Sequence, residues 1–298
     1  MRIYLAGGAS GNLAPFFNRL SDNIAIGRKD AVRDAMKIYL AGTNGREDMC
    51  ADAMKIYLAK ELCRTVDNKC NIDALILETF YYARKNEKQQ RLIPLYGDFL
   101  LDSGAFSFMS GTHSGTVNWE GYVEEYADFI RRFKVKKYFE LDIDSITGYE
   151  YVRYLRSKLE KLVGYPPIPV WHKGRGKAEF LRMCDEYKYV AIGGIVTKEI
   201  SRTEYKFFPW FISEAHKRGA KIHGLGFTNL EGIKKYHFDS VDSTAWTTGN
   251  RFGHIYRFDG RTMQKFQAPA GMRVAHKETA INNFIEWIKF QKYAETHL

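Results

Sequence analysis

Short apolar runs alternate with longer amphipathic runs between residues 99 and 246, and this alternation restricts the possible folds more than any other feature. The apolar runs predict strands at 99–104, 138–144, 168–172, 189–194, 221–226 and 238–246. The amphipathic runs predict helices at 118–133, 149–162, 178–187, 209–218 and 230–236. Strands that alternate with helices form a parallel sheet with right-handed crossover connections.

The first ninety residues contain three copies of one short apolar segment, at 1–6, 36–41 and 54–59. Their irregular spacing excludes a solenoid. Each copy is typical of a short buried strand, although 53–62 has no helix breaker and is also a candidate helix. Glycine-rich turns follow the first two copies, where they can cradle a phosphate or simply connect elements of a barrel. Residues 71–85 have an apolar face at helical spacing and predict a helix.

With one or two strands from these segments, the number of strands approaches eight. We therefore predict an α/β fold, a (β/α)8 TIM-like barrel that is irregular and has extra N-terminal segments; an open doubly wound sheet is the alternative. The chain is interpreted as one barrel domain over 1–298. Within it, 1–90 hold the N-terminal strands and repeats, 91–260 the core, and 261–298 a terminal amphipathic helix.

Polar residues and glycines stand where the predicted strands end: Asp102, Asp142, Asp144, His172, Gly193, Gly194, Gly224, Gly226 and Asp242. In a barrel, the carboxyl ends of all strands converge on one mouth. A carboxylate there is costly unless it is paired or used chemically. Structural roles stay open as well: the aspartates can cap turns, His172 can be a core histidine, and the glycines can permit tight packing.

Several carboxylates around one mouth favour covalent and acid–base chemistry. One carboxylate acting as nucleophile and a second as acid and base is the arrangement that breaks glycosidic bonds. The four cysteines, Cys50, Cys63, Cys70 and Cys184, form no CxxC pair and have no histidine at ligand spacing. We therefore predict no metal site, no cofactor and reduced thiols in a cytoplasmic protein. No run predicts a signal peptide or a membrane span.

The charge balance favours an anionic partner. Lys and Arg number 45 against 35 Asp and Glu, which gives a net charge of +10. Nucleic acid is the commonest such partner, and the 20 Phe and 19 Tyr provide rings on which bases can stack. A basic surface without a specific partner is the alternative.

Four motifs in order resemble those of the tRNA-guanine transglycosylase superfamily. They are Leu101-Asp102-Ser103-Gly104-Ala105-Phe106, Ala191-Ile192-Gly193-Gly194, His223-Gly224-Leu225-Gly226-Phe227-Thr228 and Asp239-Ser240-Val241-Asp242. The family has D-S-G-G followed by Phe or Tyr, then G-G-L, M-G-V-G-T-P and D-x-x-D. The resemblance covers roughly residues 98 to 260.

The resemblance implies base exchange in a nucleic acid. Asp242 matches the nucleophile that attacks C1′ of a guanosine nucleotide, and Asp102 matches the acid and base at N9. The remaining matches concern base binding. Phe106, close to Ser103, matches the aromatic residue that stacks on the base, and Asp142 or, alternatively, Asp144 matches the aspartate that recognises the base. His172 stands in the region of a family Gln that contacts the base, and Gly193 and Gly194 match the backbone that reads the 7-deazaguanine substituent. Gly224 and Gly226 belong to the third motif.

The departures from the family point toward DNA. The tRNA enzymes carry a zinc site after the nucleophile, whereas this chain has no cysteine after Cys184, and Ala105 replaces a glycine. Compact relatives, often phage-encoded, insert 7-deazaguanine derivatives into DNA. A DNA enzyme must extract guanine from its stack, and we predict Lys173, Arg175, Trp246 and Arg251 as residues that hold the strand.

Three other functions remain open at this point. The chain could be a tRNA guanine transglycosylase. It could be an enzyme similar to nucleoside deoxyribosyltransferases, because the opening Lys-Ile-Tyr-Leu-Ala-Gly pattern is similar to the start of that family. It could also be a barrel that binds nucleic acid without catalysis.

Overall fold

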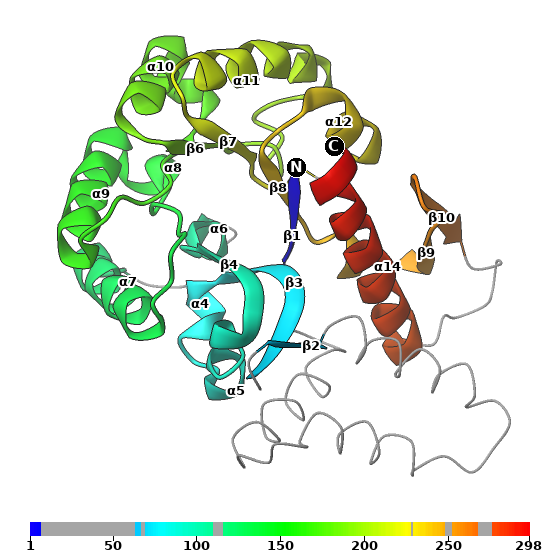
Figure 1. Cartoon of the computed structure of the whole chain (residues 1–298). Helices are drawn as coiled ribbons and strands as arrows, with labels where there is room; N and C mark the ends of the chain where they lie inside the picture. Colours follow the sequence, from blue (N-terminus) through cyan, green and yellow to red (C-terminus); the bar gives the residue numbers. More distant parts are fainter. Residues whose placement is uncertain (7–62, 67–68, 110–115, 228, 248–251, 268–275) are drawn as a thin grey trace, which may run out of the picture.

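The computed structural model describes residues 1–6, 63–66, 69–109, 116–227, 229–247, 252–267 and 276–298 (Figure 1). The second and third copies of the repeated segment, the glycine-rich turns after the first two copies, and Arg251 lie outside these residues. Among the described helices, none combines the length and the apolar character needed to cross a bilayer.

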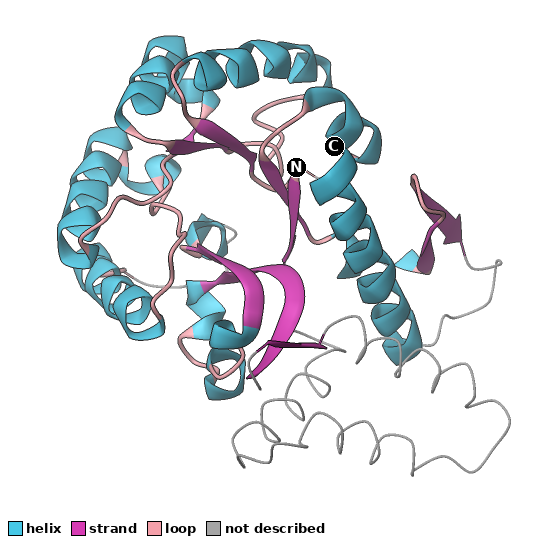
Figure 2. Cartoon of the chain, in the orientation of Figure 1, coloured by secondary structure: helices cyan, strands magenta, loops and turns pink. Residues whose placement is uncertain are grey.

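Seven parallel strands form one curled sheet in the order β4-β3-β1-β8-β7-β6-β5 (Figure 2). Their bounds are β1 Arg2–Ala6, β3 Lys69–Thr79, β4 Tyr96–Asp102, β5 Val170–Trp171, β6 Tyr189–Ile192, β7 Lys221–Gly224 and β8 Ser240–Ser243. A further strand, β2 (Cys63–Val66), pairs antiparallel with β3. The predicted mixed α/β fold with a parallel sheet is confirmed, and the first copy of the repeat is a strand, as expected.

The predicted strand at 138–144 is wrong beyond its first residues. Single bridges join Leu101 to Tyr138 and Phe139 to Ile168. After Phe139, the side chain of Glu140 rather than a neighbouring strand accepts the Val170 N–H, at 2.8 Å. The ladder therefore stops there, and Asp144 opens a short helix, α8 (Asp144–Thr147), instead of ending a strand.

The helix predicted at 71–85 is also wrong. This segment is the long strand β3, followed by one helical turn, α4 (Phe80–Ala83). The run 74–77 is buried at every position. A parallel strand that is covered on both faces reads as a continuous apolar run, so helical spacing within it is coincidental.

Helices cover the outer face of the curled sheet (Figure 1). Those in the predicted regions are α7 (Trp119–Phe133), α9 (Tyr149–Val163), α10 (Gly176–Glu186), α11 (Phe208–Lys217), α12 (Leu230–Tyr236) and α14 (His276–His297). Two more, α5 (Glu87–Gln90) and α6 (Ala105–Met109), follow β3 and β4. The predicted cap of α7 is confirmed, because Asn118 accepts the Gly121 N–H at 3.0 Å.

The terminal helix α14 ties the two ends of the chain together. Its Gln291 accepts the Leu75 N–H at 3.1 Å and donates to the Leu75 carbonyl at 3.0 Å. The same side chain donates to the carbonyl of Ile3 in β1. On its other side, α14 packs against the hairpin of β9 (His254–Phe258) and β10 (Met263–Gln267), where Asn283 accepts the Tyr256 N–H at 2.8 Å. The Gln291 contacts thus join the end of the chain to β1 and β3, which are neighbours in the sheet.

The core has two parts. The larger part lies between the sheet and its helices. The smaller part fills the inside of the curl with Tyr4, Ala6, Leu75, Leu77, Leu100, Phe139, Ile168, Val170 and Ala191. A cavity lined by Ala6, Leu77 and other strand-end residues lies next to this inner cluster.

Three buried charges connect the outer helices to the segment after Phe139. Glu140 is fully buried and pairs with Arg156 of α9 at 2.6 Å and with Arg175 at 2.9 Å. Breaking a buried ion pair from one side typically costs about 3–5 kcal/mol. We therefore expect Arg156→Met to lower the free energy of unfolding by about 3 kcal/mol in urea titrations. The control Arg153→Met, on the exposed face of α9, should change it by about 0.5 kcal/mol or less; equal effects would contradict the interpretation.

Candidate active site

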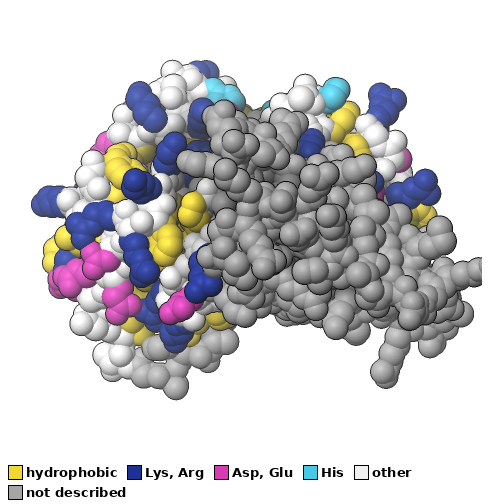
Figure 3. Space-filling model, turned by 60° about the horizontal axis from the view of Figure 1, so that its bottom comes forward, with side chains coloured by type: hydrophobic (Ala, Val, Ile, Leu, Met, Phe, Trp, Pro, Cys, Tyr) yellow, Lys and Arg dark blue, Asp and Glu magenta, His cyan; other side chains and the backbone are white. Residues whose placement is uncertain are grey.

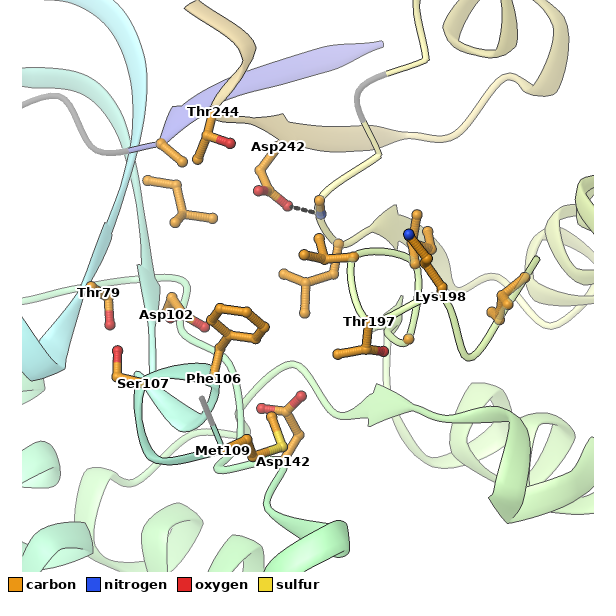
Figure 4. Close-up of a pocket in the computed structure, with 18 of the residues that line it drawn as sticks. Thr79, Asp102, Phe106, Ser107, Met109, Asp142, Thr197, Lys198, Asp242 and Thr244 are labelled. Carbon is orange, nitrogen blue, oxygen red and sulfur yellow. Dashed lines mark hydrogen bonds between the residues drawn. The ribbon is translucent and has the colours of Figure 1, made fainter. Parts of the chain in front are cut away.

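A cavity of about 1440 Å³ lies at the carboxyl ends of the strands. It brings together residues that are far apart in the sequence: Asp102, Phe106, Asp142, His172, Gly194, Gly226 and Asp242. Asp102 ends β4, Asp242 lies in β8, and Phe106 comes from α6. Figure 4 shows the three carboxylates at different sides of the cavity, with the Phe106 ring, which is 52% exposed, projecting into it.

Four other predicted site residues lie behind the wall of the cavity. Ser103 is buried and accepts the Ala105 N–H at 3.3 Å. A Cβ on Gly193 would come within 2.8 Å of the His172 ring, and one on Gly224 within 3.1 Å of Phe227, so both glycines permit tight packing. Asp144 turns away and pairs with Arg175 at 2.6 Å. These residues support the cavity without lining it.

Two of the predicted strand-holding residues, Arg175 and Trp246, need correction. The guanidinium of Arg175 is 2% exposed and is held by Glu140 and Asp144, so it has no free face for a phosphate. Trp246 is 2% exposed and donates its indole N–H to the Ala6 carbonyl at 2.9 Å, so it cannot stack on a base. Lys173 is exposed and forms a surface ion pair with Glu204 at 2.6 Å, so its role stays a prediction. The sequence pattern could not reveal the internal partners of Arg175 and Trp246.

One oxygen of Asp242 is fixed by the protein. Its Oδ1 accepts the Gly226 N–H at 2.5 Å, the dashed bond in Figure 4, and lies 3.2 Å from Nε2 of His223. The side chain is 9% exposed. Asp242 is therefore held rigidly at the cavity wall.

Asp102 lies in an environment that favours its protonated form. Burial, followed by the charges of Asp142 and Asp242, raises the pKa of Asp102 to about 7, although the Gly104 N–H, 3.1 Å from Oδ2, opposes the shift. Gly104 has a φ of 86°, and a Cβ there would lie 2.5 Å from that of Tyr81. The motif thus needs glycine at position 104. With a pKa near 7, Asp102 can both give and take a proton near neutral pH.

His172 is held between two carboxylates. Its Nε2 lies 3.1 Å from Asp142 and its Nδ1 3.0 Å from Glu199. Although burial opposes it, these hydrogen bonds raise the pKa of His172 to about 10, so the ring is an imidazolium that donates to both partners. The hydrogen bond from His172 lowers the pKa of Glu199, whereas burial raises that of Asp142.

Sequence reasoning missed Glu199. A Cβ on Gly194, whose φ is 78°, would lie 2.7 Å from the Glu199 carboxylate, which shows how closely this side chain folds back on the strand end. The sequence feature that could have pointed to Glu199 is its place as an acidic residue in the loop that follows the Gly193-Gly194 strand end.

Three cations at the cavity were also missed: Lys85, Lys198 and Arg202. Each is exposed, and no ion pair joins any of them to another described residue. The rings of Tyr82, Phe106 and Tyr205 line the same cavity. Further Lys and Arg side chains are spread over the described part of the face drawn in Figure 3. The cavity thus combines carboxylates in its interior with exposed cations and aromatic rings.

The raised pKa of Asp102 has a consequence for stability. An aspartate in an unfolded chain titrates near about 3.9, so between pH 4 and 7 the folded protein retains a proton that the unfolded chain releases, and stability falls as pH rises through this range. Asp102→Asn should remove that loss and stabilise the protein by about 1–3 kcal/mol at pH 8, with no such gain at pH 4.

Chemical denaturation at the two pH values measures this difference. The control Asp128→Asn, at an exposed position of α7, should change the free energy of unfolding by about 0.5 kcal/mol or less at either pH. An equal effect of Asp102→Asn at pH 4 and pH 8 would show that its proton does not differ between the folded and unfolded states.

Comparison with known proteins adds no relatives to this description: no family model matches the chain, and no curated protein matches it significantly. Within the described residues, no group of three or more His, Cys, Asp and Glu side chains is arranged to hold a metal ion.

Proposed function

We propose that this protein exchanges guanine for a 7-deazaguanine derivative in DNA through a covalent bond between Asp242 and the deoxyribose. The observation that carries the proposal is the meeting of Asp102 and Asp242 in one cavity, with the pKa of Asp102 raised to about 7. A fixed carboxylate beside a carboxyl group that can be protonated is the pair needed to break and remake a glycosidic bond.

In the first half of the reaction, a carboxylate oxygen of Asp242 attacks C1′ of the target nucleotide. The C1′–N9 bond breaks, and its electron pair passes to the guanine. Protonated Asp102 gives its proton to N9, so neutral guanine leaves and Asp102 becomes a carboxylate. The negative Asp242 stabilises the oxocarbenium-like centre before it forms the bond.

In the second half, the incoming base gives its N9 proton to the Asp102 carboxylate. N9 then attacks C1′, the bond between C1′ and Asp242 breaks, and its electron pair returns to the carboxylate. One base has replaced another, both aspartates have regained their starting states, and no oxidant or reductant is needed.

Recognition of the base is assigned to the groups around this pair. Asp142 offers carboxylate oxygens to the N1–H and amino group of guanine, and the imidazolium of His172 fixes its orientation. The exposed ring of Phe106 provides a stacking surface.

The three exposed cations favour a polymer over a free nucleoside. Lys85, Lys198 and Arg202 line a cavity that also holds carboxylates. A ligand that fits this division of charge has hydrogen-bond donors at one end and negative charge at the other, as a base attached to phosphodiesters does. A nucleoside alone leaves the cations unused.

The choice of DNA rests on the resemblance and on the missing cysteines after Cys184. We also propose that the fold is an irregular (β/α)8 barrel in which residues 138 and 139 replace a full fourth strand. The bridges from Leu101 to Tyr138 and from Phe139 to Ile168 support this interpretation.

The function is tested by offering labelled guanine and labelled 7-deazaguanines with single-stranded DNA, duplex DNA, tRNA or free deoxyguanosine. We expect incorporation into DNA. Incorporation into tRNA alone would show that the substrate is tRNA and not DNA. Activity on deoxyguanosine alone would favour a deoxyribosyltransferase. If no acceptor incorporates label but the protein binds DNA in a salt-dependent way, then it is a DNA-binding protein that does not catalyse base exchange.

The double variant Lys198→Gln/Arg202→Gln should weaken binding of single-stranded DNA about 10-fold or more at about 0.1 M salt. The slope of log K against log salt should become less steep by about 1 to 2, because two phosphate contacts are lost. Fluorescence anisotropy over a salt series measures both values. The control Lys136→Gln/Lys161→Gln removes two exposed cations outside the cavity lining, one in the loop after α7 and one in the last turn of α9. An equal loss in the control would contradict a role for Lys198 and Arg202.

A further inference from the structure

A chain of hydrogen bonds, partly buried at Tyr189 and buried at His223, leads from Tyr189 to Asp242. The Tyr189 hydroxyl bonds to Oγ of Ser240, which lies 2.6 Å from Nδ1 of His223. Nε2 of His223 lies 3.2 Å from Oδ1 of Asp242. These residues come from β6, β7 and β8, so the chain crosses the inside of the sheet.

His223 has no contact with solvent and is enclosed by rings. Its exposed fraction is 0%. The ring centroid of Phe139 lies 5.1 Å away and that of Tyr4 6.3 Å away. The imidazole therefore has one orientation, and its hydrogen-bond partners are those that the protein supplies.

The protons in this chain can be assigned from the acceptor at its end. An ionised carboxylate only accepts, so Nε2 of His223 carries the proton that binds Asp242. In the tautomer with its proton on Nε2, Nδ1 accepts from the Ser240 hydroxyl, and Ser240 accepts from Tyr189. Burial raises the pKa of Tyr189, so the phenol keeps its proton and remains a donor. Every group thus has a partner, which fixes one tautomer of His223.

Two donors, the Gly226 N–H and His223, therefore occupy Oδ1 of Asp242. No described residue makes a hydrogen bond to Oδ2. We infer that His223 is a positioning residue that turns Oδ2 of Asp242 toward C1′ and stabilises the carboxylate when it leaves the sugar. This inference rests on the proposed function, because it assumes that Asp242 is the nucleophile.

The two half-reactions depend differently on His223. In the covalent intermediate, Oδ2 is bonded to C1′ and Oδ1 is the carbonyl oxygen. When the C1′–Oδ2 bond breaks, its electron pair spreads over both oxygens, and the donors at Oδ1 stabilise the new charge. During formation of the bond, the same donors hold the orientation but also lower the basicity of the carboxylate, so these two effects oppose each other. Loss of His223 should therefore slow resolution of the intermediate more than its formation.

The test separates the two steps in single-turnover experiments with a single-stranded DNA oligonucleotide. Formation of the protein–DNA adduct is followed on denaturing gels without added base, and resolution is followed after guanine is added in excess. In His223→Leu, resolution should slow about 10- to 100-fold and formation by about threefold or less. His223→Gln, which keeps a hydrogen-bond donor, should recover most of the resolution rate. Ser240→Ala removes the hydroxyl that fixes the tautomer of His223, and it should slow resolution less than His223→Leu does.

The matched control is His216→Leu. His216 lies 2.9 Å from Asp239 in a second His–Asp pair, which is on the exposed side of the fold and outside the cavity lining. It should leave both rates unchanged. Thermal unfolding of each variant identifies any that fail to fold; if His223→Leu does, then the comparison of His223→Gln and Ser240→Ala with the native chain decides.

The possible failures are distinguishable. If the native protein forms no adduct with any nucleic acid, then the proposed function fails and the inference fails with it. If the native protein forms the adduct but folded His223 and Ser240 variants resolve it at the native rate, then only the role of His223 is wrong. Equal slowing of formation and resolution in His223→Leu without recovery in His223→Gln would indicate general damage to the site and would also overturn it.

Discussion

Asp242→Asn should abolish base exchange, lowering kcat by about 10⁴-fold or more. An amide is a poor nucleophile and carries no negative charge for the sugar centre. It is nearly the same size as a carboxylate, so the surrounding structure should be kept, and the oxygen of the new amide can still accept from Gly226 and His223. The variant should therefore fold and bind DNA but release no labelled guanine in a steady-state exchange assay.

A matched control for this substitution is Asp239→Asn. Asp239 immediately precedes β8 but faces His216 and the Ile222 N–H, outside the lining of the cavity. It should retain exchange within a few-fold of the native rate. Exchange at the native rate in folded Asp242→Asn would remove Asp242 from the chemistry.

Asp102→Asn should lower exchange by about 10²–10⁴-fold, the usual contribution of a general acid and base. An amide cannot protonate N9 of the departing guanine or take the N9 proton of the incoming base. The same substitution should stabilise the protein at pH 8, so loss of activity with gain of stability would separate a catalytic role from a structural one.

The pH dependence of the two steps should identify Asp102 further. The first half-reaction needs protonated Asp102 and should fall as pH rises above about 7, whereas the second needs the carboxylate and should fall below about 7. Single-turnover rates measured from pH 5 to 9 test this, and Asp102→Asn should lose both dependences. Asp98→Asn, at the opposite end of β4, is the control and should keep them; unchanged profiles in Asp102→Asn would contradict the assignment.

Much of the fold was predictable because the later strands and helices have clear local patterns. Apolar runs such as 189–192 and 221–224 are short, lie between amphipathic helices and have carboxyl ends that meet at one edge of the sheet. The position of Asp102 and Asp242 at such ends was enough to expect them in one cavity. Their placement follows from the direction of parallel strands, which the alternation of elements specifies.

The failures have physical causes that local patterns do not contain. The run 74–77 is buried on both faces, so its periodicity carried no information about helix or strand. The segment after Phe139 left the sheet because the Glu140 side chain replaced a backbone partner. Arg175 was predicted as a surface cation, but its partners Glu140 and Asp144 lie more than 30 positions earlier in the chain. Lys198, Glu199 and Arg202 follow β6, and Lys85 follows β3. Only the folded structure shows that Glu199 contacts His172 and that the three cations line the cavity.

The proposed reaction depends most directly on a covalent bond between Asp242 and the sugar. Intact-mass spectrometry of the native protein incubated with a guanine-containing DNA oligonucleotide, without an incoming base, tests it. We predict a species heavier than the protein by the oligonucleotide minus guanine, which peptide mapping places on Asp242 and which disappears when guanine is returned. No adduct under conditions that support base exchange, or an adduct on another residue, would contradict Asp242 as the nucleophile.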